Sequence, residues 1–265
     1  MSLVQINDRS QLAEYFKQDI NLHLYSLGDL DDFYWPDTTC YGIYTVSGID
    51  QVVLLYRGEG LPVLLAFTQS NFLDENFYDQ LVPLMPDQVY CHLSPSLEKQ
   101  FINHFSLVDH GLHYKMNLPD LSLVDQVNTA STLLITEDHL VEVQTLFNHS
   151  YPGNAFDPRM IATGLYYGCW KDKKLACVGG VHVYSQAYKV AALGNITTHL
   201  NYRNQGLGRT ITARLCSELS KRVDHIGLNV KADNEPALHL YQSLGFQISS
   251  NYGEFSLEKR IKSPK

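Results

Sequence analysis

Arg203, Gly206 and Gly208 follow one another in the order R-x-x-G-x-G, and this spacing points to chemistry more clearly than any other in the chain. Glycine lets a backbone turn tightly and leaves no Cβ in the way of a close ligand. A helix that starts at such a corner presents unpaired N–H groups and the positive end of its dipole. Because this arrangement suits a diphosphate, we expect the amides of residues 203–209 to bind one.

Two arginines frame this corner. Arg203 and Arg209 would form charge-assisted hydrogen bonds to phosphate oxygens, although a solvated surface position accounts for either arginine equally well. Two better-known phosphate motifs are excluded. No third glycine stands at the spacing of the dinucleotide-binding fingerprint, and no Gly-Lys-Ser/Thr follows as in a P-loop.

The segments around the corner predict the elements that position it. Residues 188–198 are rich in β-branched and apolar side chains and predict a buried strand. After the corner, Ile211, Leu215 and Leu219 recur at i, i+4 and i+8, which predicts an amphipathic helix. This order of strand, glycine turn and helix places the N–H groups of the helix at the end of the strand.

A second strand and helix are predicted next. Residues 224–230 form a short β-like run, and Asp233 or Asn234 would cap the helix that follows. Gly245 suits the C-terminal end of this helix. Residues 246–257 then predict a last strand or hairpin arm.

The stretch from Ile196 to Gly208, followed by residues 229–246, resembles the GNAT superfamily of acyl-CoA-dependent N-acyltransferases. The glycine corner is similar to the main cofactor motif of that family, and residues 234–246 are similar to its last motif. The resemblance covers residues 132–258. It implies an α/β fold built on a mixed sheet, in which the strand before the corner carries a bulge and splays from the next strand.

The resemblance also implies that acetyl-CoA, or another short-chain acyl-CoA, is a co-substrate. Pantetheine would pair with the open edge of the strand that ends at Thr198, unless this is a plain buried strand. Asn234 would touch pantetheine or serve only as a helix cap. The residues expected to bind the cofactor are Ile196, Thr197, Thr198, Arg203, Asn204, Gln205, Gly206, Leu207, Gly208, Arg209, Asn229, Asn234, Ala237 and Tyr241.

Three residues are expected to take part in the chemistry, in which an amine attacks a thioester directly. By family analogy, Tyr241 would protonate the departing thiolate, although a tyrosine on an apolar helix stripe is also typical of a core. The amide of Ile196 would donate to the developing oxyanion. Many relatives have a glutamate as the base, but residues 190–195 contain no carboxylate. His182, His199 or a water chain would replace it, and we select His182.

Length and composition restrict the class of protein. With 265 residues and 45% hydrophobic content, the chain has room for one large or two small domains. No apolar run approaches the roughly 18 residues of a membrane helix. The first residues lack the pattern of a signal peptide, so we expect a cytoplasmic protein. The five cysteines are widely spaced and predict reduced thiols, with neither disulfides nor a metal site.

Charge is unevenly distributed along the sequence. Residues 1–130 contain 5 Lys and Arg against 17 Asp and Glu, whereas residues 131–265 contain 15 against 11. A basic half suits the phosphates of coenzyme A, and an acidic half would attract a cationic amine. Neither half has the aromatic and basic patch typical of a nucleic-acid binder.

The first half shows a similar order of elements without a comparable motif. We expect a degenerate GNAT-like domain at residues 1–118, a linker at 119–131 and the acyltransferase domain at 132–265. Because the first half has no glycine corner in the right place, we expect it to bind no cofactor. Its predicted helices are 10–27, 75–84 and 96–104, and its predicted strands are 39–46, 51–56, 62–67 and 88–93, with a turn at 57–60.

The sequence therefore predicts a two-domain N-acyltransferase that acts on a primary amine of a small molecule or peptide. An acyl-CoA sensor without catalysis, or a partner-binding module on the same fold, remains open because no carboxylate base is evident. We expect no nucleic-acid or membrane partner. The acceptor amine and the oligomeric state are not indicated by any motif.

Overall fold

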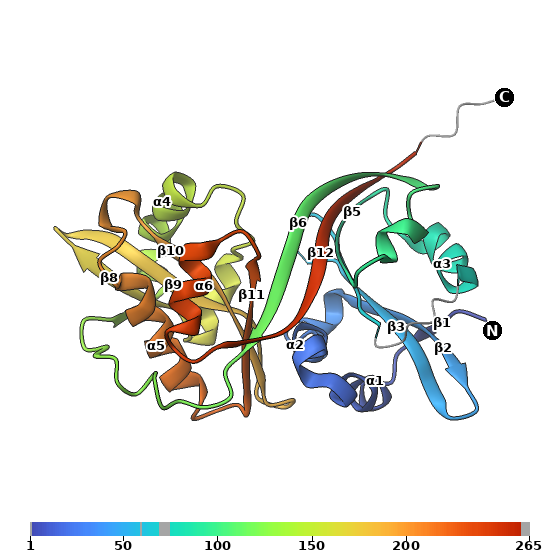
Figure 1. Ribbon diagram of the computed structural model, residues 1–265, viewed down its shortest axis with the longest axis horizontal. Coiled ribbons are helices and arrows are strands. Elements are labelled where there is room, and N and C mark those ends of the chain that lie inside the picture. The colour runs from blue at the N-terminus through green and yellow to red at the C-terminus, as the bar shows by residue number, and fades with distance from the viewer. Residues whose placement is uncertain (1, 59, 69–74, 261–265) are drawn as a thin grey trace. The chain divides into compact units, whose positions relative to one another are not determined.

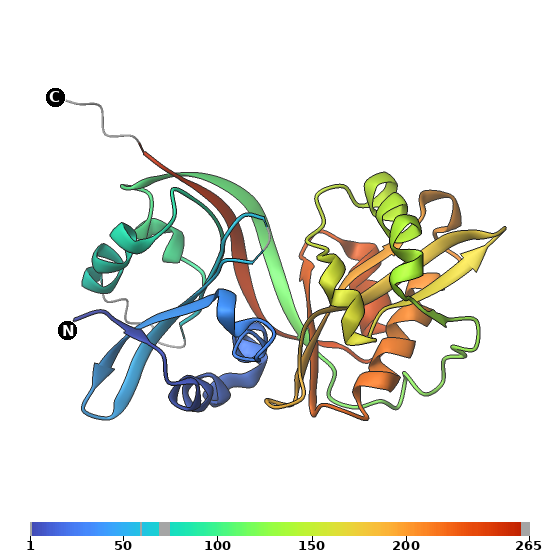
Figure 2. The same cartoon turned by 180° about the vertical axis from the view of Figure 1, so that it is seen from behind.

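The computed structural model describes residues 2–58, 60–68 and 75–260 of the chain. It divides into two compact units, which Figures 1 and 2 show from opposite sides. The first unit comprises Met1–Tyr114, Lys231–Asp233 and Ser250–Lys265, and the second comprises Lys115–Val230 and Asn234–Ser249. Neither unit is one continuous stretch of sequence.

The first unit is built on a mixed sheet with the strand order β1-β2-β3-β4-β5-β12-β6. β4 and β5 run parallel, whereas the pairs β1–β2, β2–β3, β3–β4 and β5–β12 are antiparallel. In chain order its elements are β1 (Val4–Ile6), α1 (Arg9–Phe16), η1 (Lys17–Asp19), α2 (Ile20–Gly28), η2 (Trp35–Asp37), β2 (Thr38–Thr45), β3 (Gly48–Tyr56), β4 (Val63–Ala66), α3 (Glu75–Leu81), η3 (Val82–Leu84), β5 (Gln88–Leu93), η4 (Leu97–Gln100), β6 (Phe105–Asn117) and β12 (Gln247–Lys259).

A hydrophobic core lies on one face of this sheet. Alternate residues of β5 and β12 point into it, as the period of two in a strand requires. Aromatic rings of α3 and of the turn after β5 close it. Its largest fully buried members are Phe77, Tyr78, Phe101 and Phe105.

Most of the strands predicted for this unit are confirmed, but two of its helices were predicted wrongly. Residues 10–27 form α1 and α2 with η1 between them, because Asp19 accepts a hydrogen bond from Leu22 N and starts a new helix there. Residues 96–104 form only η4, since Ser96 has a φ of 73° and provides no side-chain cap. Glu59, within the predicted turn at 57–60, lies outside the described residues.

The second unit has the strand order β6-β11-β10-β9-β8-β7, in which β6 enters through its last residues. β10 and β11 run parallel, and the pairs β9–β10, β8–β9 and β7–β8 are antiparallel. Its elements are β7 (Leu133–Leu134), η5 (Glu137–His139), α4 (Leu140–Ser150), η6 (Pro158–Thr163), β8 (Tyr167–Lys171), β9 (Lys174–Ser185), β10 (Val190–Thr198), η7 (Leu200–Tyr202), α5 (Leu207–Leu219), β11 (His225–Lys231) and α6 (Glu235–Gln242).

Two adjacent glycines show which helices cover each face of this sheet. A Cβ on Gly179 would meet Ile211 of α5 at 2.8 Å, and a Cβ on Gly180 would overlap the Tyr166 ring. Tyr166 packs through Phe156 towards α4. Because neighbouring residues of a strand point to opposite faces, α5 and α4 lie on opposite sides. Figure 1 shows α5 and α6 on one side, and Figure 2 shows α4 on the other.

Two long strands are divided between the units. Residues 253–258 of β12 pair with β5 in the first unit, beside β6 in Figure 1. The end of β6 belongs to the second unit, where Leu118 N donates to Ile226 O and Ser249 Oγ donates to Lys115 O. This division differs from domains at 1–118 and 132–265, and it places residues 119–131 inside the second unit. Hydrophobic alternation predicts a strand but not the sheet that the strand joins.

Candidate functional site

The parallel strands β10 and β11 separate at a defined point in the second unit. Their pairing runs from Val190↔His225 to Leu193↔Leu228. Beyond that pair, both strands continue, to Thr198 and Lys231, without further pairing between the residues that the structure describes. The edge of β10 from residue 194 to 198 is therefore open. An extended ligand can form main-chain hydrogen bonds to such an edge.

In the described part of the first unit, the corresponding parallel strands do not separate. There β4 and β5 stay paired from Val63↔Tyr90 to Ala66↔Leu93, and Ser94 N still donates to Ala66 O. The main-chain groups of β4 are thus satisfied by β5. That the first half binds no cofactor stays a prediction.

Two β-bulges lie next to the point where the strands separate. Ala192 pairs with Val183 but Leu193 pairs with Val181, so His182 is an extra residue on β9. Gly194 pairs with Gly180 but Thr197 pairs with Val178, which leaves one extra residue on β10 between them. Bulges redirect side chains and main-chain groups out of a ladder. The bulge that the family resemblance implied is thus present on β10, and the bulge at His182 was not predicted.

The imidazole of His182 occupies the space beside Gly194. A Cβ on Gly194 would overlap the ring, so only glycine at this position accommodates it. His182 is half-buried. The ring therefore lies at the position on β10 from which a longer side chain would otherwise project.

The glycine corner after β10 starts helix α5. Asn204 and Gly206 have φ values of 60° and 76°, which only glycine and asparagine adopt at little cost. The first main-chain bond of α5 joins Thr210 N to Gly206 O. The N–H groups of Leu207, Gly208 and Arg209 precede it, and no side chain among the described residues caps the helix. Unpaired amides at the start of a helix suit an anion, and diphosphate binding by residues 203–209 stays a prediction.

Gly208 has a packing role that the sequence did not indicate. A Cβ there would meet Leu240 of α6 at 2.9 Å, whereas a Cβ on Gly206 would meet no atom within 4 Å. Gly206 is thus required by its backbone conformation and Gly208 by the close approach of α6. Of the arginines, Arg203 is exposed and donates weakly to Thr198 O at 3.5 Å, and Arg209 donates to Ser243 Oγ at 3.2 Å. Asn204 and Gln205 are exposed.

Helix α6 lies beside the open end of the slot. Ala237, Leu240 and Tyr241 form its apolar stripe, and all three are only half-buried. Burial raises the pKa of the Tyr241 hydroxyl well above its ordinary value, and nearby Tyr151, Cys177 and Cys216 add to this effect. Tyr241 therefore stays protonated at neutral pH, as a proton donor must.

Asn234 is the N-cap of α6, and its side chain accepts from Ala237 N at 3.3 Å. Of the two residues considered as caps, Asn234 rather than Asp233 has this role. Its amide group is exposed, so contact with pantetheine remains a prediction. Cys177, near Tyr241, bonds to Thr198 Oγ1 at 3.2 Å, and burial raises its pKa to about 12.

Three buried side-chain oxygens around the slot have no hydrogen-bond partner among the described residues. They are Asn195 Oδ1, Thr197 Oγ1 and Asn229 Oδ1. Asn229 is the first residue of β11 beyond the paired segment, and the other two follow Gly194 on β10. Buried polar atoms are normally paired. The Asn195 amide is held by Tyr166 through its Nδ2, so the oxygens of Thr197 and Asn229 are the two that suit a polar ligand.

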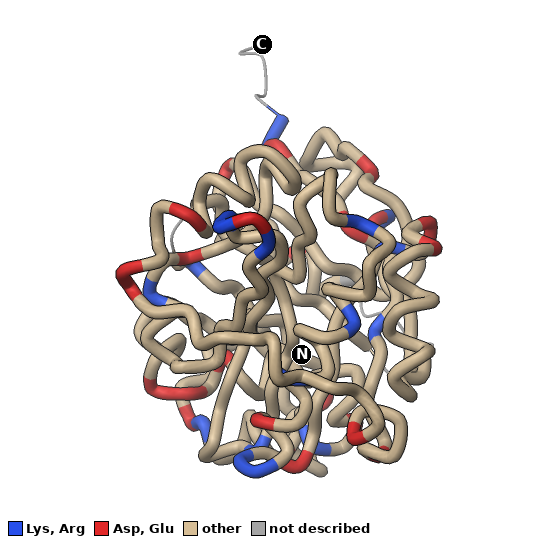
Figure 3. Tube along the Cα trace, turned by 90° about the vertical axis from the view of Figure 1, so that its left-hand side faces the viewer, with Lys and Arg blue, Asp and Glu red and all other residues tan. Residues whose placement is uncertain are grey.

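The net charges of the two structural units differ from those of residues 1–130 and 131–265, because neither unit is continuous in sequence. The second unit contains 11 Lys and Arg against 10 Asp and Glu, and the first unit contains 9 against 18. Four basic residues of the last seven in the chain belong to the first unit. In Figure 3, residues of both signs are interspersed along the trace. A diphosphate bound at the predicted site would therefore depend on main-chain amides and the two arginines, rather than on a basic domain.

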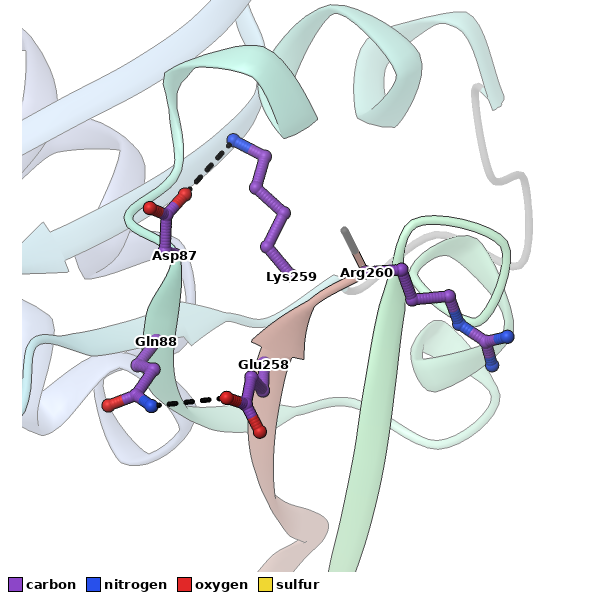
Figure 4. Close-up of a pocket in the computed structure, with 5 residues that line it drawn as sticks. All are labelled: Asp87, Gln88, Glu258, Lys259 and Arg260. Carbon is purple, nitrogen blue, oxygen red and sulfur yellow. Dashed lines mark hydrogen bonds and ion pairs between the residues drawn. The ribbon is translucent and has the colours of Figure 1, made fainter. Parts of the chain in front are cut away.

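Elsewhere, a pocket of about 520 Å³ lies in the first unit (Figure 4). It contains none of the predicted site residues. Its charged groups already have partners, since Lys259 pairs with Asp87 at 3.6 Å and Gln88 donates to Glu258 at 3.4 Å. Within the described ranges, no group of His, Cys, Asp and Glu is placed to hold a metal ion. None of the helices in those ranges is long and apolar enough to span a bilayer.

Residues 134–246, which contain the residues described above, match the model of the acetyltransferase (GNAT) family. Among curated proteins, the chain is similar to the ribosomal protein bS18-alanine N-acetyltransferase of Escherichia coli K12, with 46% identity over 66 residues. Those residues are 23% of this chain and 45% of that protein, so the chain spans less than half of the length of this relative.

Two solved structures are similar over nearly the whole chain. One is a GCN5-related N-acetyltransferase from Sphaerobacter thermophilus, with a TM-score of 0.61, 11% identity and coverage of 98% and 96% of the two chains. The other is a tandem GNAT protein from the clavulanic acid biosynthesis pathway, with a TM-score of 0.57, 12% identity and coverage of 99% and 100%. These likenesses show the predicted fold, a mixed α/β architecture with two GNAT-like halves.

Proposed function

We propose that the second unit transfers an acetyl or other short acyl group from acyl-CoA to a primary amine. The observation that carries this proposal is the slot between β10 and β11, which opens after Leu193 and Leu228 beside the unpaired amides that start α5. A thioester of coenzyme A has a diphosphate for those amides and a pantetheine arm for the open strand edge. Residues 132–258 would carry the activity.

In this proposal the diphosphate binds the amides of residues 206–209, and Arg203 and Arg209 contribute charge. Pantetheine pairs with Ile196, Thr197 and Thr198 on β10. Asn229, Asn234 and Ala237 line the opposite side of the arm. Binding at both ends fixes the thioester relative to the bulge on β10, which is how enzymes convert binding into orientation.

The chemistry follows from three groups around the bulges. The amide of Ile196, in the bulged segment of β10, donates to the carbonyl oxygen of the thioester as negative charge develops there. His182, in the bulge on β9, accepts a proton from the attacking amine. The C–N bond forms, the C–S bond breaks, and Tyr241 donates its proton to the departing sulfur. Tyr241 regains a proton from solvent.

The acceptor is proposed as a primary amine of a small molecule or peptide. The relative from Escherichia coli is named for an alanine of a ribosomal protein, so a peptide with N-terminal alanine is one acceptor to test. A small cationic amine is the other, because the first unit is acidic. Either acceptor must lose its ammonium proton before its nitrogen attacks the thioester.

Two measurements test the proposal on the full-length protein. Calorimetry with CoA and acetyl-CoA should show binding, and CoA release should depend on one member of an amine panel. Binding without release on any amine would instead favour an acyl-CoA sensor. If neither CoA nor acetyl-CoA produced heat with folded protein, both assignments would fail.

A further inference from the structure

We propose that Asn195 and Tyr166 form a clamp that positions the bulge on β10, and with it the amide of Ile196. This inference rests on the proposed function and adds two positioning residues to it. Neither residue would touch substrate. They would act by fixing the direction of one main-chain N–H group.

The clamp is a short chain of hydrogen bonds across the sheet. Asn195 Nδ2 donates to the Tyr166 hydroxyl at 3.0 Å, and that hydroxyl donates to the carbonyl oxygen of Val181 at 3.1 Å. Val181 is paired with Leu193, two residues before Asn195. The chain therefore ties the bulged segment of β10 to β9 by side-chain bonds where main-chain pairing is interrupted.

The surroundings hold the tyrosine in one place. Tyr166 is fully buried, and Asn195 is 4% exposed. The tyrosine ring covers Gly180, where a Cβ would overlap it, and Gly180 is the partner of Gly194 across the two strands. Because burial keeps water out, the hydrogen bonds of the clamp are not exchanged for bonds to solvent.

The backbone at Asn195 explains why this residue is asparagine. Its φ is 55°, in the left-handed region that asparagine tolerates better than most residues. Glycine would adopt the same φ without forming the clamp. The side chain of Asn195 thus supplies the hydrogen bond, and its backbone supplies the turn of the bulge.

The test compares Tyr166→Phe, Asn195→Gly and the double variant with wild type. Tyr166→Phe keeps the ring over Gly180 and removes the hydroxyl, and Asn195→Gly keeps the φ and removes the amide. Each single variant should lower kcat about 10- to 100-fold, the range for a displaced catalytic group. The Kd for CoA should stay within about twofold, because the diphosphate site is separate from the clamp.

Two further comparisons separate positioning from general stability. The double variant should be no slower than the worse single variant, because both changes break one chain of bonds. Tyr184→Phe is the control on β9, since its hydroxyl donates to the side chain of Gln186 and not to the clamp, and it should retain wild-type kcat. Calorimetry should also show that wild type prefers acetyl-CoA over CoA and that the clamp variants lose this preference.

The proposal is overturned if Tyr166→Phe and Asn195→Gly retain wild-type kcat and the wild-type preference for acetyl-CoA. It is also overturned if their losses are additive and CoA binding weakens in parallel, as general destabilisation would produce. If wild type binds CoA but acylates no amine, the proposed function fails, and the preference for acetyl-CoA still decides the clamp. If wild type does not bind CoA, both proposals fail.

Discussion

Tyr241 illustrates how the surroundings of one residue decide its role. A tyrosine on an apolar helix stripe is usually a core residue, but the stripe of α6 is only half-buried. The raised pKa of its hydroxyl results from burial first, and then from Tyr151 and two thiols. The hydroxyl therefore carries its proton at neutral pH, which is the protonation state from which a general acid acts.

Tyr241→Phe is expected to lower kcat about 10²- to 10⁴-fold, the usual contribution of general acid–base catalysis, with little change in the Kd for CoA. Because the folded pKa is raised, the acid form is lost only as pH rises through that elevated value. Wild-type kcat should therefore show no decline from Tyr241 between pH 7 and 9 in a pH–rate profile. Full activity in the variant would exclude Tyr241 from the mechanism.

Gly206→Glu is expected to abolish CoA binding, because a carboxylate would fill and repel the anion site. Gly206→Ala is the matched control. No atom lies within 4 Å of the Cβ that alanine would add at position 206, so this change adds only the strain of a positive φ, about 1 kcal/mol. Calorimetry should detect CoA binding by the alanine variant and none by the glutamate variant. Comparable binding by both would place the diphosphate elsewhere.

At the scale of elements, the paired bulges on β9 and β10 account for the difference between the two halves. The same parallel pair remains closed in the first unit, from Val63↔Tyr90 to Ala66↔Leu93. In the second unit, His182 and Asn195 are drawn out of the ladder within a few residues of each other. Both units therefore contain a parallel pair of strands, but the described pair that separates is the one beside the two bulges. The proposed site depends on these bulges and not on strand order alone.

Gly194→Ala is expected to lower kcat about 10- to 100-fold by displacing the His182 ring from its place over residue 194. The same change in a His182→Ala background should add little, because the ring that it displaces is absent. Steady-state kinetics of the two singles and the double would show this. Full additivity would mean that residue 194 acts through another contact.

The sequence predicted the glycine corner, the strand before it and the helices α5 and α6, because the signals for these elements are local. Gly206 and the cap at Asn234 are examples, since each depends only on neighbouring residues. The bulge at His182 was not predictable, because the extra residue is defined only by the partner strand. Likewise, the need for glycine at position 208 comes from Leu240, which follows it by more than thirty residues.

At the scale of the whole molecule, β12 carries a charged cluster into the first unit. Glu254 accepts from the hydroxyls of Tyr90 and Tyr252, and lies 3.5 and 3.4 Å from the imidazoles of His92 and His113. Burial acts to raise the pKa of Glu254, but the two imidazoles and two hydroxyls together hold it below its ordinary value. The carboxylate thus stabilises the fold while it is ionised.

Glu254→Gln is expected to reduce the free energy of unfolding by about 1–3 kcal/mol at pH 7. Since the folded pKa is lowered, the contribution of Glu254 is complete above its ordinary value near 4.5 and declines as pH falls below it. Urea unfolding should show that wild type and variant differ less at pH 3.5 than at pH 7. A difference independent of pH would contradict this assignment.

A chain of residues 1–118 alone is expected not to fold, because the strand between β5 and β6 would be missing. Circular dichroism should show little ordered structure for it. The matched control is the same chain joined by a flexible linker to residues 247–260, which restores the missing strand. Cooperative unfolding of residues 1–118 without that addition would contradict the requirement for β12 between β5 and β6.

The path of β12 also affects how the protein is made. Most of the amino-terminal sheet is synthesised first, yet the place between β5 and β6 is filled by a strand that leaves the ribosome after α6. During translation, the edge of β5 that pairs with β12 therefore has no partner until β12 has been synthesised. Maturation of the early half is tied to completion of the late one, so a stalled ribosome would release neither half in finished form.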